Sequence, residues 1–322
     1  MPGNHRCVTS SPVGFSTRLC TSLAGIELRN PIVAAAGTCG YVEELADAFD
    51  LAALGAVTTK SITREPREGN LPWRVVPTQA GMLNAIGLAN KGIERFLAEE
   101  APLVRSCGAV VIASVAGHTI DDFVTVAGAL DESQEFRAIE LNVSCPNTAT
   151  GRHFGNDATA LRELLTAVRA AVTRARLFVK LPPDMADPVA ICATAIERGA
   201  NALVLCNTMP AMAIDVQTRR MRLSRGQGGL SGPAIHPIVV RIVHDVYNQV
   251  ARAAGVPIIG LGGVLAWQDA AELILAGATA VGMGTALFVD PRSPQRVVRG
   301  LDRWVGDQGV SNVSQLVGQI AQ

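Results

Sequence analysis

The chain has 322 residues, of which 48% are hydrophobic, 17% are charged and 4% are aromatic. Its 28 Lys and Arg balance its 28 Asp and Glu, so no net charge draws the protein to nucleic acid or to an anionic membrane. The composition predicts a globular protein with a large aliphatic core, and no segment reaches the roughly 18 uninterrupted apolar residues of a membrane span. We therefore expect no nucleic-acid partner and no membrane partner.

The amino-terminal segment is polar and lacks the apolar centre of a secretory signal. We predict a loosely ordered extension over residues 1–22 and a single domain over residues 23–322, although the extension could instead order against the domain or a partner. The cysteines include no CxxC pair and no histidine at metal-ligand spacing, which predicts a reduced, cytoplasmic compartment and no metal site. They are Cys7, Cys20, Cys39, Cys107, Cys145, Cys192 and Cys206.

Eight short apolar runs alternate with segments of helical periodicity. The runs are Pro31–Ala36, Ala56–Lys60, Val110–Val115, Ile139–Val143, Leu177–Lys180, Ala202–Cys206, Pro257–Gly260 and Ala280–Met283. The helical segments include Ala158–Arg174, Val189–Arg198, Pro237–Ala253 and Trp267–Ala276. Continuous apolar runs are typical of parallel strands buried on both faces, so we predict an α/β protein with a (β/α)8 TIM barrel. A doubly wound open sheet is the alternative.

Two connections are too long for plain crossovers and are predicted insertions after strands 2 and 6. They are Ser61–Lys91 and Asn207–Pro233, and both follow the carboxyl ends of strands. Because a barrel binds its ligand at that face, these glycine-rich loops are candidate walls or lids over the site. The alternative is a tolerated surface insertion.

The segment Glu140–Asn147 reads Glu-Leu-Asn-Val-Ser-Cys-Pro-Asn and follows a predicted buried strand. Pro146 pushes Cys145 away from helical geometry, so the thiol is expected on a stiff loop beside Asn142 and Ser144. A thiol held among polar groups is a candidate proton acceptor, whereas a lone cysteine elsewhere is more often a small buried hydrophobe. Cys145 is therefore the candidate catalytic residue.

Paired glycines follow the seventh and eighth predicted strands, in Gly260–Gly263 and in Gly282–Thr285. Loops at these two positions are the usual phosphate cradle of a barrel, where backbone N–H groups and a hydroxyl neutralise an anion. The dinucleotide fingerprint GxGxxG is not evident, so NAD bound in the Rossmann manner is not expected on this chain.

Lys60 and Lys180 each end an apolar strand, and a buried ammonium is unfavourable unless it meets an anion. Each is therefore a candidate ligand contact, one for a reduced flavin and one for a substrate carboxylate. An internal ion pair, for example with Glu140, is the structural alternative. A Schiff base on Lys180, as in an aldolase-type barrel, is a functional alternative.

Several motifs together resemble the dihydroorotate dehydrogenase family over about Leu23 to Pro291. They are Asn142–Asn147, Asn84–Leu88, Asn207–Thr208, Gly229–Pro233, Gly262–Gly263 and Gly284–Thr285. The resemblance implies an FMN-containing barrel that oxidises (S)-dihydroorotate to orotate in pyrimidine synthesis. A cysteine base is typical of class 1, and the stretches Asn84–Asn90 and Thr150–Gly155 resemble the NAD-linked class 1B more than the fumarate-linked class 1A.

Position by position, the resemblance implies that Cys145 removes the C5 proton while hydride passes from C6 to flavin N5. The matching substrate positions are Lys60, Asn84, Ala85, Ile86, Gly87, Leu88, Asn142, Asn147, Asn207 and Thr208. The matching FMN positions are Ala36, Gly37, Lys60, Ser61, Ser114, Asn142, Lys180, Cys206, Gly232, Gly262, Gly263, Gly284 and Thr285. Two of these depart from the class 1B pattern, since Ser114 stands where Asn is common and Cys206 where a branched aliphatic residue is common.

The resemblance also implies a homodimer that joins an iron-sulfur flavoprotein subunit in a heterotetramer. The chain lacks the cysteine cluster of an iron-sulfur centre, so FAD, the cluster and NAD are expected on that partner subunit. Two further readings remain open, namely a related FMN barrel that acts on another dihydropyrimidine and a non-catalytic flavin-binding barrel.

Overall fold

The structure is a computed structural model, and it describes residues 16–41, 44–46, 48–144 and 154–321. Eight parallel strands form a closed barrel, because the last strand pairs with the first. The strands in order are β3 (Ile32–Ala34), β4 (Ala56–Thr58), β7 (Val110–Val115), β8 (Ala138–Asn142), β9 (Arg176–Leu181), β10 (Ala202–Leu205), β15 (Ile258–Leu261) and β16 (Ala280–Met283). The predicted TIM barrel is confirmed, and the open sheet is excluded.

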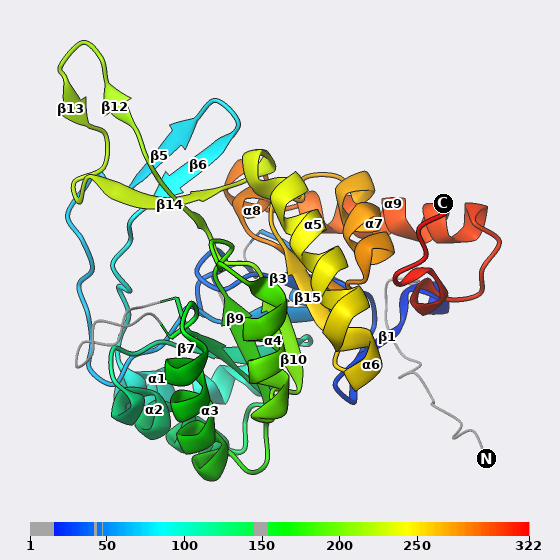
Figure 1. Cartoon of the computed structure of the whole chain (residues 1–322), viewed down its shortest axis with the longest axis horizontal. Coiled ribbons are helices and arrows are strands. Elements are labelled where there is room, and N and C mark those ends of the chain that lie inside the picture. The colour runs from blue at the N-terminus through cyan, green and yellow to red at the C-terminus, as the bar shows by residue number, and fades with distance from the viewer. Residues whose placement is uncertain (1–15, 42–43, 47, 145–153, 322) are drawn as a thin grey trace.

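Helices surround the barrel (Figure 1). They are α1 (Ile93–Glu99), α2 (Ile120–Ser133), α3 (Ala158–Ala171), α4 (Pro188–Glu197), α5 (His236–Val246), α6 (Arg252–Ala254), α7 (Trp267–Ala276), α8 (Thr285–Val289) and α9 (Ser293–Asp307). Acidic or hydroxyl side chains cap several of them, as Thr119 does in a capping box with Asp122 at the start of α2. The predicted helix Pro237–Ala253 is divided by a π-helical turn over Tyr247–Ala251.

Short 3-10 turns complete the connections. They are η1 (Thr17–Leu19), η2 (Leu51–Ala53), η3 (Ala101–Arg105), η4 (Pro233–Ile235) and η6 (Val313–Leu316).

The barrel lumen is filled by side chains from alternate strand positions, and a hairpin covers its amino-terminal end. Ile112, Ala138 and Phe178 belong to the lumen cluster. The hairpin of β1 (Thr21–Leu23) and β2 (Ile26–Leu28) adds its apolar residues to the same cluster. The amino-terminal end of the lumen is therefore packed, and a ligand reaches the barrel at the carboxyl ends of its strands.

Residues 16–22, which the sequence prediction assigned to the extension, are part of the fold. Leu19 is buried, and Arg18 pairs with Asp302 of α9 at 3.3 Å. Because residue 22 lies inside β1, the predicted boundary falls within a strand. Residues 1–15 lie outside the described part of the chain.

The two long connections form one antiparallel sheet that stands above the barrel (Figure 1). Its order is β11 (Met209–Met212), β14 (Gln227–Ser231), β6 (Gly81–Asn84) and β5 (Val75–Thr78). A further hairpin, β12 (Ile214–Asp215) with β13 (Arg220–Met221), projects from it. The sequence predicted loops here, because glycine and proline interrupt the strands and because the central pairing, β6 with β14, joins residues about 145 positions apart.

None of the described helices has both the length and the apolar content needed to cross a membrane.

Candidate active site

A cavity of about 380 Å³ lies at the carboxyl ends of the barrel strands, beneath the antiparallel sheet. This volume is within the range of small-molecule and cofactor sites. Most of the residues that the sequence singled out line it. These are Ala36, Gly37, Lys60, Ser61, Asn84, Ile86, Leu88, Asn142, Lys180, Cys206, Asn207, Thr208, Gly232, Gly262, Gly263, Gly284 and Thr285.

Strand alternation explains why polar side chains meet at this end of the lumen. In β8, Ala138 belongs to the apolar lumen cluster, so Glu140 and Asn142 point to the same side at successive higher layers. In β9, Phe178 is in that cluster and Lys180 lies one layer above it, in register with Asn142. Along β8 and β9 the lumen therefore changes from apolar to polar within about two residues.

Three asparagines present amides to the cavity from separate elements. Asn207 Nδ2 donates to Asn142 Oδ1 at 3.0 Å across the barrel mouth. Asn84 of β6 donates to the carbonyl oxygen of Gly229 in β14 at 3.2 Å, which ties the overlying sheet together beside the cavity. Amides offer both donors and acceptors, so this wall can match the edge of a planar heterocycle.

The two lysines differ in environment. Lys180 is buried, with 4% of its surface exposed, whereas Lys60 is partly exposed. Burial lowers the pKa of Lys60, the nearby charge of Arg74 lowers it further, and Glu44 opposes the shift. Burial raises the pKa of Glu140, while the charge of Lys180 and a hydrogen bond from Ser114 oppose that rise. The Lys60 cation is thus held at the cavity at a free-energy cost that an anionic ligand would offset.

The glycine pairs form a close-fitting wall. Gly263 has φ +75°, and a Cβ there would lie 2.5 Å from the Cβ of His236. Gly232 has φ +96°, and a Cβ there would lie 2.8 Å from the Cα of Gly81. His236 Nδ1 also forms a hydrogen bond with the carbonyl oxygen of Gly262 at 2.7 Å, which stabilises the turn at Gly262 and Gly263. A side chain at either position would meet protein atoms in a strained backbone conformation, so glycine is required at both.

Comparison with known proteins identifies the family. A family model described as dihydroorotate dehydrogenase matches residues 18–305. The chain belongs to the dihydroorotate dehydrogenase family.

Among its relatives, a Pelobacter propionicus protein is 44% identical over 303 residues, covering 94% of this chain and 98% of the relative. It is named dihydroorotate dehydrogenase B (NAD(+)), catalytic subunit. A Solibacter usitatus protein named putative dihydroorotate dehydrogenase A (fumarate) is 44% identical over 307 residues, covering 95% and 99%. A Trichlorobacter lovleyi protein is 43% identical over 303 residues, covering 94% and 98%, and carries the same B-type name as the first.

Several predicted family positions do not line the cavity. Ala85 and Gly87 are not among its lining residues. Ser114, the departure from the class 1B pattern, is fully buried below the cavity wall, with its hydroxyl 2.9 Å from that of Ser61. The shorter side chain thus binds Ser61 rather than reaching the cavity. Cys145 and Asn147 lie outside the described residues.

The other predicted cysteine position, Cys206, lines the cavity but is 2% exposed. Burial raises the pKa of its thiol strongly, so Cys206 remains protonated and is unsuited to act as a base.

The structure adds lining residues that sequence reasoning missed, above all Arg74. Its Nη1 donates to the carbonyl oxygens of Glu68 and Asn70, both at 3.2 Å, which holds the guanidinium at the cavity rim. The sequence feature that could have identified Arg74 is its place directly before the alternating segment Val75–Thr78, inside a predicted lid. The other added positions are Ala35, Thr38, Val75, Met82, Ser231, Ile235, Leu261 and Phe288.

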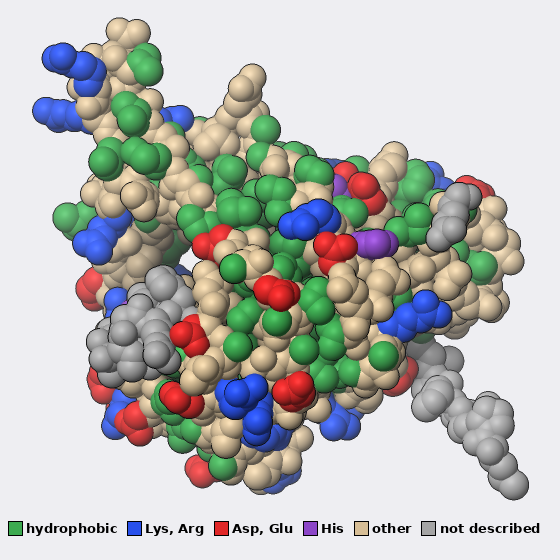
Figure 2. Space-filling model, viewed as in Figure 1, with side chains coloured by type: hydrophobic (Ala, Val, Ile, Leu, Met, Phe, Trp, Pro, Cys, Tyr) green, Lys and Arg blue, Asp and Glu red, His purple; other side chains and the backbone are tan. Residues whose placement is uncertain are grey.

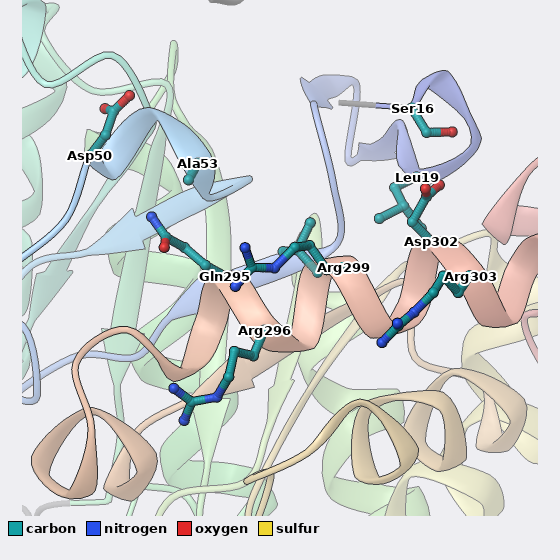
Figure 3. A pocket seen from close by; sticks show the side chains of 10 residues that line it. Ser16, Leu19, Asp50, Ala53, Gln295, Arg296, Arg299, Asp302 and Arg303 are labelled. Atoms are coloured by element: carbon teal, nitrogen blue, oxygen red, sulfur yellow. The ribbon is translucent and has the colours of Figure 1, made fainter. Parts of the chain in front are cut away.

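A larger cavity, of about 680 Å³, lies outside the barrel along α9 (Figure 3). Arginines of α9 line it together with Asp50 and Asp302, and Arg18 already pairs with Asp302. The face of the molecule in Figure 2 likewise carries Lys and Arg side chains interspersed with Asp and Glu. This outer groove contains none of the family's motif residues, so size alone does not mark the active site.

Proposed function

We propose that this protein catalyses the FMN-dependent oxidation of (S)-dihydroorotate to orotate in pyrimidine biosynthesis. The observation that carries the proposal is the barrel-mouth cavity, which combines two lysines and three asparagines with a glycine wall. Family membership supports the same reaction.

The residues present fit FMN. Gly232, Gly262, Gly263, Gly284 and Thr285 would hold its phosphate, since these residues line the cavity and combine glycine backbone with a hydroxyl. The positions proposed for the rest of the cofactor are Ala36, Gly37, Lys60, Ser61, Asn142, Lys180 and Cys206. Bound there, FMN would supply the hydride acceptor, and the protein would supply binding, orientation and charge.

Lys60 and the asparagines would bind the substrate. The Lys60 ammonium suits the carboxylate, and Arg74 adds a second positive charge at the same wall. Asn84, Asn142 and Asn207 suit the carbonyl and N–H groups of the ring. Asn147, Thr208 and the segment 85–88 complete the proposed set. A site built on amides would reject analogues that lack the matching groups.

Cys145 is the proposed base that removes the C5 proton. Its sequence neighbour Ser144 accepts a hydrogen bond from Asn207 at 2.9 Å, so the residue before the base is tied to the substrate wall. A thiolate is the active form, and a free thiol has a pKa of about 8.5. Unless the site lowers that pKa, the rate is expected to rise with alkaline pH.

The proposed final acceptor is NAD, reached through a partner subunit that carries FAD and an iron-sulfur cluster. The name "catalytic subunit" of the B-type relatives supports a partner, and the motif at Asn84–Asn90 supports the same class. We propose a homodimer within a heterotetramer, located in the cytoplasm. Co-purification from the native host should recover an iron-sulfur flavoprotein. Recovery of the chain alone, with fumarate accepted as oxidant, would favour the activity named for the Solibacter relative.

Three other functions predict different results. A related FMN barrel that acts on another dihydropyrimidine would bind uracil in preference to orotate. A Schiff-base aldolase would trap substrate on Lys180 with borohydride and show no flavin colour. A non-catalytic flavin-binding barrel would lose no function on Cys145→Ala.

One spectroscopic experiment tests the proposal. The purified protein should be yellow, and anaerobic addition of dihydroorotate should bleach it. A yellow protein that does not bleach would keep the flavin barrel but reject this substrate. A colourless protein that FMN does not reconstitute would overturn the proposal.

A further inference from the structure

A continuous line of side-chain hydrogen bonds runs beneath the cavity from a buried carboxylate. Glu140, 3% exposed, accepts from Ser114 Oγ at 3.1 Å. The hydroxyls of Ser114 and Ser61 are 2.9 Å apart. Ser61 Oγ in turn accepts from Asn142 Nδ2 at 3.3 Å. The line therefore connects a group below the cavity to an amide that lines it.

The far end of the line fixes the direction of its hydrogen bonds. The backbone N–H of Thr208 donates to Asn207 Oδ1 at 2.9 Å. A backbone N–H can only donate, so the oxygen of Asn207 faces Thr208 and its NH₂ group faces away. That NH₂ group donates to Asn142 Oδ1. The nitrogen of the Asn142 amide is thereby directed to Ser61.

The near end requires the same direction. Ser114 Oγ donates to Glu140 Oε1, so the single hydroxyl proton of Ser114 points to Glu140. Ser114 then accepts from Ser61, whose own proton is used, and Ser61 must accept from an amide nitrogen. Both ends of the line thus require the same orientation of the Asn142 amide, with its oxygen toward Asn207 and its nitrogen toward Ser61. The second N–H of Asn142 is then available to donate to a ligand in the cavity.

We propose that Glu140 and Ser114, neither of which lines the cavity, are positioning residues that set the amide orientation of Asn142 for the ligand. The inference rests on the proposed function, because orotate is the ligand. It implies that the ligand atom beside the Asn142 nitrogen is a hydrogen-bond acceptor. Ser114 stands where class 1B sequences commonly have Asn, so this chain builds the line with a hydroxyl.

The test measures orotate affinity of the FMN-loaded protein by equilibrium titration, which does not depend on turnover. Ser114→Ala should weaken orotate binding about three- to tenfold, the loss typical of one hydrogen bond. Thr194→Ala removes a comparably buried hydroxyl, one that binds Ala190 within α4, and should leave orotate affinity unchanged. Thermal melting of both variants checks that the fold is retained.

Substitutions at Glu140 separate the hydrogen bond from the charge. Glu140→Gln keeps an acceptor oxygen. The hydrogen bonds that begin at Thr208 leave the Ser114 hydroxyl with a proton to donate, so the amide oxygen of the glutamine should face Ser114. Orotate affinity should therefore stay within about twofold of the parent protein. Glu140→Leu removes the acceptor and should weaken binding as Ser114→Ala does. The double variant Ser114→Ala/Glu140→Leu should lose less than the sum of the two single losses, because both act on one line.

The outcomes are distinct. Equal orotate affinity in Ser114→Ala and Thr194→Ala would overturn the inference, and so would fully additive losses in the double variant. A parent protein that binds FMN but no orotate would reject the proposed function itself.

Discussion

Lys60 and Arg74 face the same cavity from different elements, and the charge of Arg74 adds to burial in lowering the pKa of Lys60. Lys60 follows the second barrel strand, whereas Arg74 precedes β5 in the overlying sheet. Two cations at one wall repel each other unless an anion lies between or beside them. Their arrangement therefore favours a ligand with a negative charge at this end of the cavity.

Removing the Lys60 charge should weaken binding of the carboxylate substrate. We expect Lys60→Gln to raise the Kd for orotate about 10- to 100-fold, because a hydrogen bond to a charged group contributes about 1.5–3 kcal/mol. Arg252→Gln, on the exposed surface of α6, is the control and should bind orotate normally. An unchanged Kd in Lys60→Gln would remove Lys60 from the substrate site.

The lowered pKa of Lys60 also predicts how orotate binding depends on pH. The charged form of Lys60 binds the carboxylate, so the affinity for orotate should be full below the lowered pKa and should fall as the pH rises through it. This fall should begin at a lower pH than the ordinary lysine pKa of 10.5 would predict. Lys60→Arg should bind orotate without this fall, since its guanidinium stays protonated. Isothermal titration at several pH values measures both proteins, and an identical fall in Lys60→Arg would assign the titration to another group.

Cys145→Ala should slow reduction of the flavin by dihydroorotate about 10²- to 10⁴-fold, the usual contribution of a general base. Orotate binding should persist, because the proposed substrate contacts remain. Cys107→Ser, a half-buried thiol that does not line the cavity, provides the control. Anaerobic stopped-flow absorbance measures the rate, and a rapid reduction in Cys145→Ala would assign the base elsewhere.

Two glycine variants distinguish the requirements of the fold from those of the cofactor. Gly284 has φ −119°, and a Cβ there would meet its nearest neighbour at 3.5 Å. Gly284→Ala should therefore fold normally but bind less FMN, because the added methyl group would occupy space at the proposed phosphate site. Gly263→Ala should lose stability as well, because of its positive φ and the contact with His236. Flavin-to-protein ratios and melting temperatures report the two effects. Full FMN content in Gly284→Ala would place the phosphate away from β16.

Local sequence patterns predicted the barrel well because most residues of each barrel strand are apolar. The bounds of β7, α7 and β16 coincide with the predicted segments. The overlying sheet was missed because β6 pairs with β14, so its stability depends on contacts between distant segments. The buried position of Ser114 was missed for the same reason, since its hydroxyl contacts that of Ser61, 53 residues away. Arg74 has local hydrogen-bond partners, but its place in the cavity depends on the sheet that lies over the barrel.

Asp131 at the end of α2 should be a main source of acid sensitivity in this fold. The buried carboxylate accepts N–H bonds from the backbone of Thr173, Arg174 and Ala175 at 2.7 to 3.2 Å, which ties α2 to the segment before β9. Burial acts to raise its pKa, but these N–H groups outweigh it and hold the pKa below the usual value. The carboxylate therefore stabilises the fold fully above the unfolded pKa of about 3.9, and this contribution is lost as pH falls toward the lower folded pKa.

Asp131→Asn should lower the free energy of unfolding by about 1.5–3 kcal/mol at pH 7, since an amide nitrogen would face backbone donors. Asp121→Asn on the same helix, where the side chain is 75% exposed and pairs with Arg64, should change it by less than about 1 kcal/mol. Urea denaturation measures both variants at pH 7 and again near the folded pKa, where the deficit of Asp131→Asn should shrink. A deficit that stays constant with pH would show that packing, rather than the carboxylate charge, holds this junction.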